Sequence, residues 1–568
     1  MKKIAGIFIA LIIIAPVLYA QSSLDLFQKF YDEKNLEEAV KYASAAAMQN
    51  QKNVDLMVKI GIAFSELEKH DSALVYFKKA YELKDSDPQV AQHYARALAN
   101  VKNYPEAVKV INQAIKRDKN NYRNYLTAAE IYIMADSLTQ AELSINRARE
   151  IDPNNPESYI ALGNFYFARR VYELSRQNYE EAILKDSNNI EAHAKLAESY
   201  YWLASRETDK DLSNELYTRS LKEWGKVSQL DSMNARAYFE QGKIWFFSER
   251  YSEAAQVLSR FLKLRPSGSL GRWYFAQSLF KVGECDSAIP NLEIVIKEID
   301  SVQIQAKKML AECNMIKRNF ARASEVYQDL FNSGVELTTI DYQRWGQADF
   351  SKGDTLSALN HWKKAIDIDK EGNCYLMFLV STLMTNMKDY TGSNQMLYQR
   401  LSIPSCNDSL NAKVYYIIGT NYIFSNQPDS AIIYLQKAVE TDPKNYFAIV
   451  YLGDAYMQIK NQKLAMSKYL EVIEKGEQDS TVNRSAVFQA FARYCNVLLM
   501  DKNFAELNKY SRRWVDLMPD NSLANLFTAV SYQGLNDKDN ACKYYNRVLR
   551  IDPGNKDARS NKEIIGCP

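Results

Sequence analysis

The chain has 568 residues, of which 47% are hydrophobic and 25% are charged. This composition is that of a globular protein and excludes an intrinsically disordered chain. The 71 Lys and Arg residues nearly balance the 69 Asp and Glu residues, so no global field attracts a polyanion and we expect no nucleic-acid partner. With only 19 glycines and 13 prolines to interrupt it, the chain is predicted to be helical throughout.

The first twenty residues have the pattern of an export signal. Two lysines precede an apolar run over residues 4–15, which a proline ends, and the small Ala20 then precedes the polar Gln21. This order is typical of a secretory signal peptide, so we expect cleavage between Ala20 and Gln21. The alternative is an uncut membrane anchor, but the run is shorter than the roughly 20 apolar residues of a spanning helix. The mature chain is predicted to lack a transmembrane segment and to be exported to the periplasm or the cell envelope.

The sequence then repeats with a period of 34 residues. Residues 122–155 align with residues 156–189, so that Ala129 corresponds to Gly163 and Ala148 to Ala182. A period of this length is the signature of a repeat array. Extending the frame in both directions gives fifteen units, which start at residues 20, 54, 88, 122, 156, 190, 235, 269, 304, 339, 374, 412, 446, 488 and 522.

Small residues recur at two positions of the repeat. Position 8 is Gly, Ala, Ser or Cys in every unit except the first, which has Phe27, and position 20 is Ala or Ser except at Leu507. Small residues at such positions let two antiparallel helices approach closely. Bulky residues at positions 4, 11 and 24, such as Tyr159, Tyr166 and Tyr179, fill the surrounding space. In five units a proline at position 32 ends the second helix, because proline lacks an N–H group.

These residues at this spacing resemble the tetratricopeptide repeat family over about residues 20–555. The resemblance implies an all-α fold, a right-handed superhelical solenoid of about fifteen helix-turn-helix repeats. It also implies a concave face, lined mainly by the first helix of each unit, that typically holds a peptide or a protein helix. A single unit cannot bury its own apolar stripe, so neighbouring units must stack.

Irregular stretches divide the array. Unit 6 is 45 residues long, and its eleven extra residues, which fall around residues 205–216, are enough to lengthen both helices by whole turns. A Gly- and Ser-rich break follows Pro266, where we expect a bend, although a tolerated loop insertion has the same pattern. The expected organisation is an N-terminal array at residues 21–268, a C-terminal array at 269–555 and a capping tail at 556–568.

In the family, first-helix positions 2, 5, 6, 9, 12 and 13 line the concave surface. In units 5 to 8 these positions are rich in aromatic residues, whereas units 2 and 3 carry polar residues there. Aromatic side chains in a groove suit the burial of an apolar helix or peptide anchor. The alternative is that position 12 faces the neighbouring helix and that the longer unit 6 buries Tyr201 and Trp202 itself. The predicted partner-binding residues, here called the aromatic cluster, are Phe167, Tyr201, Trp202, Phe239, Phe246, Phe247, Trp273, Tyr274 and Phe280.

All seven cysteines lie in the second half of the chain, and in an exported protein paired cysteines become oxidised. Cys374 opens the first helix of unit 11 and Cys406 lies just beyond its second helix. Because antiparallel helices bring these two ends together, this pair is the first candidate for a disulfide. Cys542 and Cys567 are the second candidate, since a bond between them attaches the tail to unit 15.

The other three cysteines are less informative. Cys285 and Cys313 are a weaker pair, because their heights along adjacent helices are expected to differ. Cys495 occupies a small-residue position and is expected to be a buried free thiol. The alternative for all seven is that they are reduced and simply packed.

No motif for catalysis, metal binding or cofactor binding is present. The sequence has no Gly-rich phosphate loop, no HExxH and no CxxC, and its four histidines are widely scattered. The Lys, Asn and Arg set with which some repeat proteins clamp a carboxylate is also missing, because Asn164 stands alone at position 9. We therefore expect no catalytic residues, no metal and no cofactor.

These observations predict a non-enzymatic scaffold or adaptor of the bacterial cell envelope that binds a partner peptide or helix in its concave groove. Secretion, surface-attachment and polysaccharide-export assemblies all contain exported proteins that resemble this one. The alternative is a soluble, chaperone-like periplasmic carrier of exported polypeptides, which would bind many unfolded chains. A catalytic envelope protein is a third class, and the missing motifs count against it.

Overall fold

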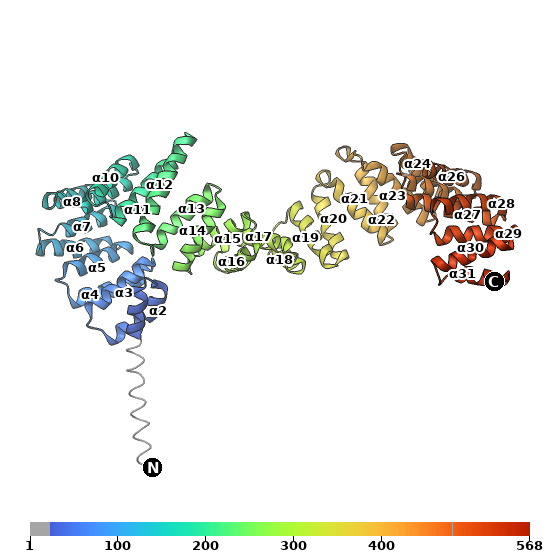
Figure 1. Cartoon of the computed structure of the whole chain (residues 1–568). Helices are drawn as coiled ribbons and strands as arrows, with labels where there is room; N and C mark the ends of the chain where they lie inside the picture. Colours follow the sequence, from blue (N-terminus) through green and yellow to red (C-terminus); the bar gives the residue numbers. More distant parts are fainter. Residues whose placement is uncertain (1–22, 480) are drawn as a thin grey trace, which may run out of the picture. The chain divides into compact units, whose positions relative to one another are not determined.

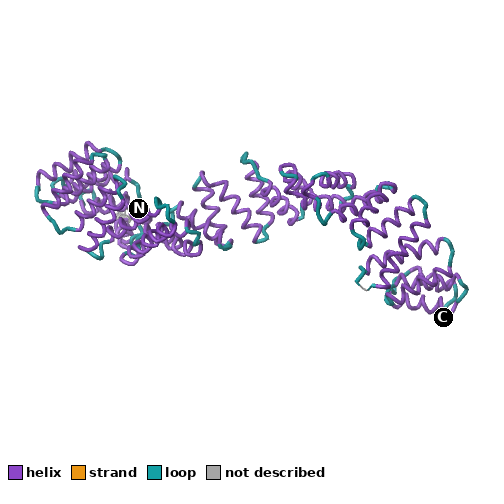
Figure 2. The backbone as a smooth tube through the Cα atoms, turned by 90° about the horizontal axis from the view of Figure 1, so that it is seen from above, coloured by secondary structure: helices purple, strands orange, loops and turns teal. Residues whose placement is uncertain are grey.

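The computed structural model describes residues 23–479 and 481–568. Helix follows helix through these residues, with no strand among them (Figures 1 and 2). The predicted all-α repeat solenoid is confirmed. The expected cleavage site at Ala20 and Gln21 lies outside the described residues.

The chain forms two compact units, one ending at Leu330 and the other starting at Phe331. In the N-terminal unit, residues 23–32 are helical and are followed by α2 (Leu36–Gln49), α3 (Val54–Glu66), α4 (His70–Leu83), α5 (Pro88–Asn100), α6 (Tyr104–Arg117), α7 (Tyr122–Met134), α8 (Leu138–Ile151), α9 (Pro156–Ala168), α10 (Tyr172–Lys185), α11 (Ile190–Ala204), α12 (Lys210–Leu230), α13 (Ala235–Phe247), α14 (Tyr251–Leu264), α15 (Ser269–Lys281), α16 (Cys285–Glu298), η1 (Asp300–Val302), α17 (Gln303–Ile316) and most of α18 (Phe320–Asn332). The C-terminal unit contains α19 (Thr339–Lys352), α20 (Thr355–Ile368), η2 (Glu371–Asn373), α21 (Cys374–Asn386), α22 (Tyr390–Leu401), η3 (Pro404–Cys406), α23 (Asn411–Phe424), α24 (Pro428–Thr441), α25 (Tyr446–Gln458), α26 (Gln462–Gln478), α27 (Arg484–Met500), α28 (Phe504–Leu517), α29 (Ser522–Gly534), α30 (Lys538–Ile551) and α31 (Lys556–Ile564).

The small residue at position 8 lies against the bulky residue at position 24 of the same unit. A Cβ atom added at Gly61 would lie 2.7 Å from the ring of Phe77, and one added at Gly163 would collide with the ring of Tyr179. Glycine is required at these places because a larger residue would push the two helices apart. This contact joins the two helices of a unit and leaves the exposed side of each first helix free to form a surface.

Unit 6 uses its extra residues mainly in the second helix. The helix α11 has 15 residues and α12 has 21, so α12 takes most of the insertion. Near the start of α11, His193 Nδ1 lies 2.6 Å from a carboxylate oxygen of Glu223 in α12, and Nε2 lies 3.1 Å from the carbonyl oxygen of Ser187. The hydrogen bond with Glu223 raises the pKa of His193, because both ring nitrogens face acceptors.

The break after Pro266 lies inside the N-terminal unit, and the division between the two units comes later, after Leu330. The segment around the break is held by residues from the start of the chain. The backbone N–H of Ser267 donates to the carboxylate of Glu37 at 3.2 Å, and the guanidinium of Arg265 donates to the backbone carbonyl of Glu66 at 2.8 Å. These contacts hold the segment around the break, and the array boundary expected at residues 268 and 269 stays a prediction.

Three disulfides join neighbouring elements. Cys374 is bonded to Cys406 with Cα atoms 5.3 Å apart, and Cys542 is bonded to Cys567 at 5.5 Å, which ties the tail after α31 to α30. The less favoured pair, Cys285 and Cys313, is also bonded, with a Cα separation of 5.2 Å. The expectation that these two cysteines lie at different heights along adjacent helices is wrong, because α16 and α17 are consecutive helices that run antiparallel. Cys285 begins α16, beside the end of α17 where Cys313 lies.

The remaining cysteine, Cys495, is a buried free thiol in α27. Burial raises its pKa to about 12, so it remains protonated and unreactive at neutral pH.

Candidate functional site

The aromatic cluster lies on successive first helices of the N-terminal unit, namely α9, α11, α13 and α15. Tyr274 of α15 lies at the centre of one group, with its ring centroid 5.0 Å from that of Phe246, 5.7 Å from Phe247 and 6.3 Å from Phe239. The rings of these four residues therefore form a continuous contact between α13 and α15.

A second group of rings belongs to α9, α10 and α11. Trp202 stacks on Tyr172 at 5.9 Å, and Tyr172 meets Phe167 edge-on at 5.1 Å. The ammonium of Lys243 lies 4.9 Å from the ring of Tyr201 and 5.8 Å from the ring of Phe239. This cation connects the two groups, since it is attracted by the faces of both rings.

The members of the cluster differ in their access to solvent. Phe247 is 62% exposed and Trp202 is 42% exposed, whereas Phe167, Tyr201, Phe239, Phe246, Tyr274 and Phe280 are partly buried. Trp273 is only 6% exposed, so the structure does not place it where a partner can reach it. Trp273 occupies position 5 of its unit, where Leu126 and Ile160 of units 4 and 5 are also buried, whereas Phe239 at the same position of unit 7 stays partly exposed.

Beside the cluster, the start of the N-terminal unit contacts its later repeats. The ammonium of Lys34 lies 3.0 Å from a carboxylate oxygen of Asp231, 197 residues further on. Together with the contacts of Arg265 and Ser267, this ion pair forms the clasp, which joins units 1 and 2 to units 6 and 7. A cavity of about 880 Å³ lies at the clasp, and its lining includes Phe239 of the aromatic cluster.

The cavity at the clasp is highly charged. Its lining includes Lys34, Glu37, Glu66, Glu68, Asp231, Arg236, Glu240 and Arg265. Burial raises the pKa of Glu66, and the nearby cations Lys34 and Arg265 oppose that shift. The charged clasp and the exposed rings thus give the N-terminal unit two chemically different surfaces next to each other.

The C-terminal unit contains a cavity of about 490 Å³ between α19 and α21. Seven of its lining residues occupy concave positions of units 10 and 11, and the same positional pattern that predicted the aromatic cluster also marks them. The sequence prediction did not include them, because it named concave residues only in units 2, 3 and 5 to 8. The lining residues are Gln343, Gln347, Phe350, Trp362, Gly372, Asn373, Tyr375, Leu376, Leu379, Thr382, Leu383 and Asn386.

Neither a metal centre nor a membrane span emerges from the described part of the chain. Residues 23–479 and 481–568 hold no group of three or more His, Cys, Asp or Glu side chains placed to bind a metal ion. In the same residues no helix combines the length and the apolar character needed to cross a bilayer.

Comparison with known proteins identifies the repeats. Family models described as tetratricopeptide repeat match residues 64–125, 102–165, 412–445 and 527–555. The chain is 30% identical over 97 residues to the tetratricopeptide repeat domain-containing protein PYG7 of Arabidopsis thaliana, which is 17% of this chain and 32% of that protein. It is also 30% identical over 150 residues to human tetratricopeptide repeat protein 29, covering 23% of this chain and 32% of that one. The chain thus spans about a third of the length of these curated relatives.

Among solved structures, the C-terminal part of a TPR repeat-containing protein from Cytophaga hutchinsonii aligns with 50% of this chain and 97% of its own length. The sequence identity is 19% and the TM-score is 0.31.

Proposed function

Given that this chain is a tetratricopeptide repeat protein, we propose that it is an exported, non-enzymatic scaffold of the bacterial cell envelope, with a partner bound on the aromatic cluster of its N-terminal unit. Tetratricopeptide repeats themselves support a protein-interaction scaffold. The proposal goes further in its compartment, in its place within a secretion, surface-attachment or polysaccharide-export assembly, and in the surface used.

The observation that carries the proposed surface is the exposure of two large aromatic side chains beside partly buried ones. Trp202 and Phe247 come from neighbouring first helices and lie against the rings of Tyr172 and Tyr274. Large aromatic residues contribute much of the free energy at protein interfaces when they become fully buried. A partner that covers both side chains gains this burial without rearranging the helices.

Two observations support the proposed compartment. The first twenty residues have the pattern of an export signal. Six of the seven cysteines form disulfides, and such bonds persist in oxidising compartments such as the periplasm. Mass spectrometry of the chain purified from fractionated cells tests this directly: we expect a mature N-terminus at Gln21 in an envelope fraction, and an intact N-terminus in the cytosol contradicts export.

Crosslinking in intact cells separates a scaffold from a carrier. We expect one partner to be recovered at a fixed ratio from the envelope. Many partners at low and variable ratios indicate a chaperone-like carrier of exported polypeptides and contradict the scaffold.

A further inference from the structure

We propose that the clasp is a latch, which opens and closes in the intact chain and, while closed, limits the size of a group that can reach the Phe239 end of the aromatic cluster. The latch itself does not depend on the proposed function, and only its consequence for partner binding rests on that proposal.

The clasp joins parts of the N-terminal unit that are far apart in the sequence. On one side lie the turn before α2, the start of α2 and the end of α3, and on the other lie the turns that follow α12 and α14 (Figure 1). Three repeats, with helices α5 to α10, separate the two sides along the array. Each repeat packs mainly on its neighbours, so small rotations at several interfaces add up at the clasp. The two sides can therefore separate while every repeat stays folded.

The contacts across the clasp are polar and open to solvent. The side chains of the ion pair between Lys34 and Asp231 are 56% and 20% exposed. The hydrogen bonds of Arg265 and Ser267 across the clasp also lie at the surface. Exposed ion pairs stabilise a structure only slightly, because water and salt screen their charges. A clasp made of such contacts is therefore easily opened.

Apolar packing, in contrast, stays within each side. The buried cluster that includes Phe27 and Ile60 has no residue of units 6 and 7, and the cluster around Trp224 has none of units 1 and 2. Neighbouring units do share such clusters, since Phe77 of unit 2 packs with Tyr94 of unit 3. The helices on the two sides of the clasp do not pack closely on one another. The clasp thus lacks the apolar burial that holds neighbouring units together.

The clasp also leaves space between its two sides. The cavity of about 880 Å³ is lined by Leu36 and Leu67 from one side and by Met233, Phe239 and Leu270 from the other. Met233 is 37% exposed and Leu270 is 51% exposed, so the closed clasp does not bury them against the opposite side. Closing therefore gains little free energy from apolar burial. We infer that the closed and the open form are close in free energy.

The same cavity is where the latch meets the aromatic cluster. The ring of Phe239, which lines the cavity, lies 5.4 Å from that of Phe261 and 6.3 Å from that of Tyr274. Two turns of an α-helix with side chains occupy roughly 850–1,200 Å³, so a segment of that size fills the closed cavity or exceeds it. A larger partner needs the clasp to open before it can cover Phe239, whereas Trp202 and Phe247 stay exposed with the clasp closed.

Distance measurements test the latch without any partner. Spin labels are attached at Lys69→Cys and Lys263→Cys, two exposed positions on opposite sides of the clasp, and pulsed EPR gives the distribution of distances between them in the full-length oxidised chain. Cys495 is buried and takes no label. We expect mainly short distances at low salt. The population at longer distances should grow about two- to fivefold at about 1 M salt, where the Debye length is only about 3 Å.

Charge variants distinguish the clasp from a general effect of salt. Lys34→Glu should produce the longer distances already at low salt, and Lys34→Asp/Asp231→Lys should return the short ones. The matched control is Lys84→Glu, which breaks an ion pair of similar exposure, 55% for Lys84 and 25% for Asp87, within one turn of the chain. It should leave the distances unchanged. Distances that neither salt nor Lys34→Glu alters contradict the latch, as does an equal change in Lys84→Glu.

Alkylation tests the consequence for access. Ala235→Cys places a thiol in the cavity at the start of α13, and a maleimide that carries a bulky polyethylene glycol reports whether a large group reaches it. Its rate should rise about two- to fivefold at high salt and in Lys34→Glu. Leu184→Cys, at a position that is 77% exposed on α10, should react at one rate throughout. If Ala235→Cys lowers the melting temperature, Met233→Cys replaces it, since Met233 also lines the cavity.

The two measurements have separate consequences. Longer label distances with an unchanged alkylation rate in the cavity contradict the proposed control of access. Neither measurement uses the partner, so a failure to find an envelope partner would bear on the proposed function alone.

Discussion

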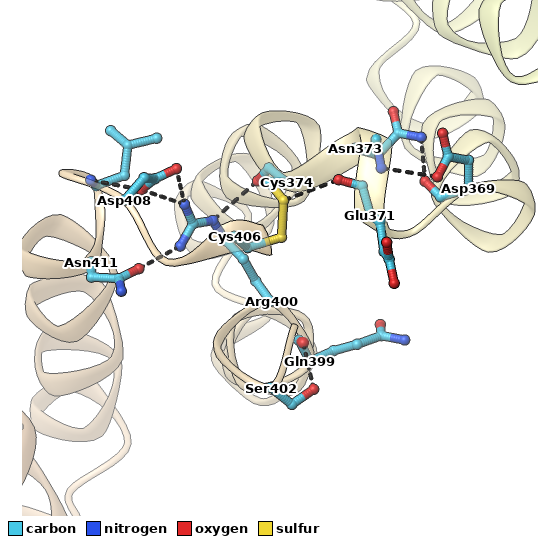
Figure 3. The surroundings of a disulfide bond; sticks show 12 residues. Asp369, Glu371, Asn373, Cys374, Gln399, Arg400, Ser402, Cys406, Asp408 and Asn411 are labelled. Atoms are coloured by element: carbon cyan, nitrogen blue, oxygen red, sulfur yellow. Dashed lines mark hydrogen bonds and ion pairs between the residues drawn. A yellow bond between two sulfur atoms is a disulfide. The ribbon is translucent and has the colours of Figure 1, made fainter. Parts of the chain in front are cut away.

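Removing the disulfide between Cys374 and Cys406 should destabilise one defined part of the C-terminal unit. The two residues are 32 positions apart in the sequence. In the chain-entropy model, a loop of this length restricts the unfolded chain by about 3.7 kcal/mol at 25 °C. The hydrogen bonds of Arg400 to Asp408 (2.7 and 2.8 Å) and Asn411 (2.7 Å) hold the same segment without the disulfide (Figure 3). We therefore expect Cys374→Ser/Cys406→Ser to fold and to lose most of this free energy.

Hydrogen exchange measured by mass spectrometry is the suitable assay, because a repeat array can unfold locally and a single transition does not describe it. Amides of α21, α22 and α23 should exchange faster in the double variant, by a factor that corresponds to roughly 3–4 kcal/mol where exchange requires opening of the closed loop. Cys285→Ser/Cys313→Ser is the control, since its loss should leave α21–α23 unchanged. Unaltered exchange in α21–α23 of the first variant would refute the reasoning.

Three further predictions concern the N-terminal unit. Gly163→Ala should lower the free energy of unfolding by roughly 1–3 kcal/mol, because the added Cβ collides with a buried tyrosine ring. Gly225→Ala should raise it by about 0.5–1 kcal/mol, because the added Cβ has no atom within 4 Å and alanine favours the helix. Thermal melting of the two variants compares these effects. The pKa of His193 is raised in the folded state, so its charged form stabilises the fold. This contribution is complete below about pH 6.5, the ordinary histidine pKa, and is lost as the pH rises through the folded-state pKa. The difference in unfolding free energy between wild type and His193→Gln should therefore shrink from pH 6 to pH 9, and a constant difference contradicts the pairing. Lys34→Glu places a like charge opposite Asp231, so hydrogen exchange of the amides in α2 and α3 should become faster by a factor equivalent to about 0.2–1 kcal/mol. The charge-swapped variant Lys34→Asp/Asp231→Lys should return this exchange to the wild-type rate.

The helix pairs could be predicted from the sequence because the contact that forms them is local. Positions 8 and 24 belong to the same unit, and the side chains there are complementary in size, as where Gly61 lies against the ring of Phe77. The helices α9 and α29 begin at Pro156 and Ser522, the first residues of predicted units 5 and 15. A pattern that recurs within short stretches of chain therefore identifies the start of most first helices to within a residue, although α27 begins at Arg484 rather than at residue 488.

The clasp could not be predicted in this way. It joins Glu37 to Ser267, 230 residues apart, and depends on small rotations added over seven units. The Gly- and Ser-rich break after Pro266 gave no sign that this segment contacts residues near the start of the chain. The burial of Trp273 could not be predicted from its place in the repeat either, because Phe239 has the same place in unit 7 and stays partly exposed. The cavity between α19 and α21, in contrast, lies at positions that the repeat pattern already marks.

The most direct test of the account is partner capture with the aromatic cluster altered. The mature chain is crosslinked in native envelopes as wild type, as Trp202→Ala/Phe247→Ala, and as Leu143→Ala/Leu184→Ala, which changes two exposed leucines of the second helices α8 and α10. The account predicts one dominant partner that the wild type and the leucine variant retain and the aromatic variant loses. A single partner captured equally by all three chains would contradict binding at the aromatic cluster.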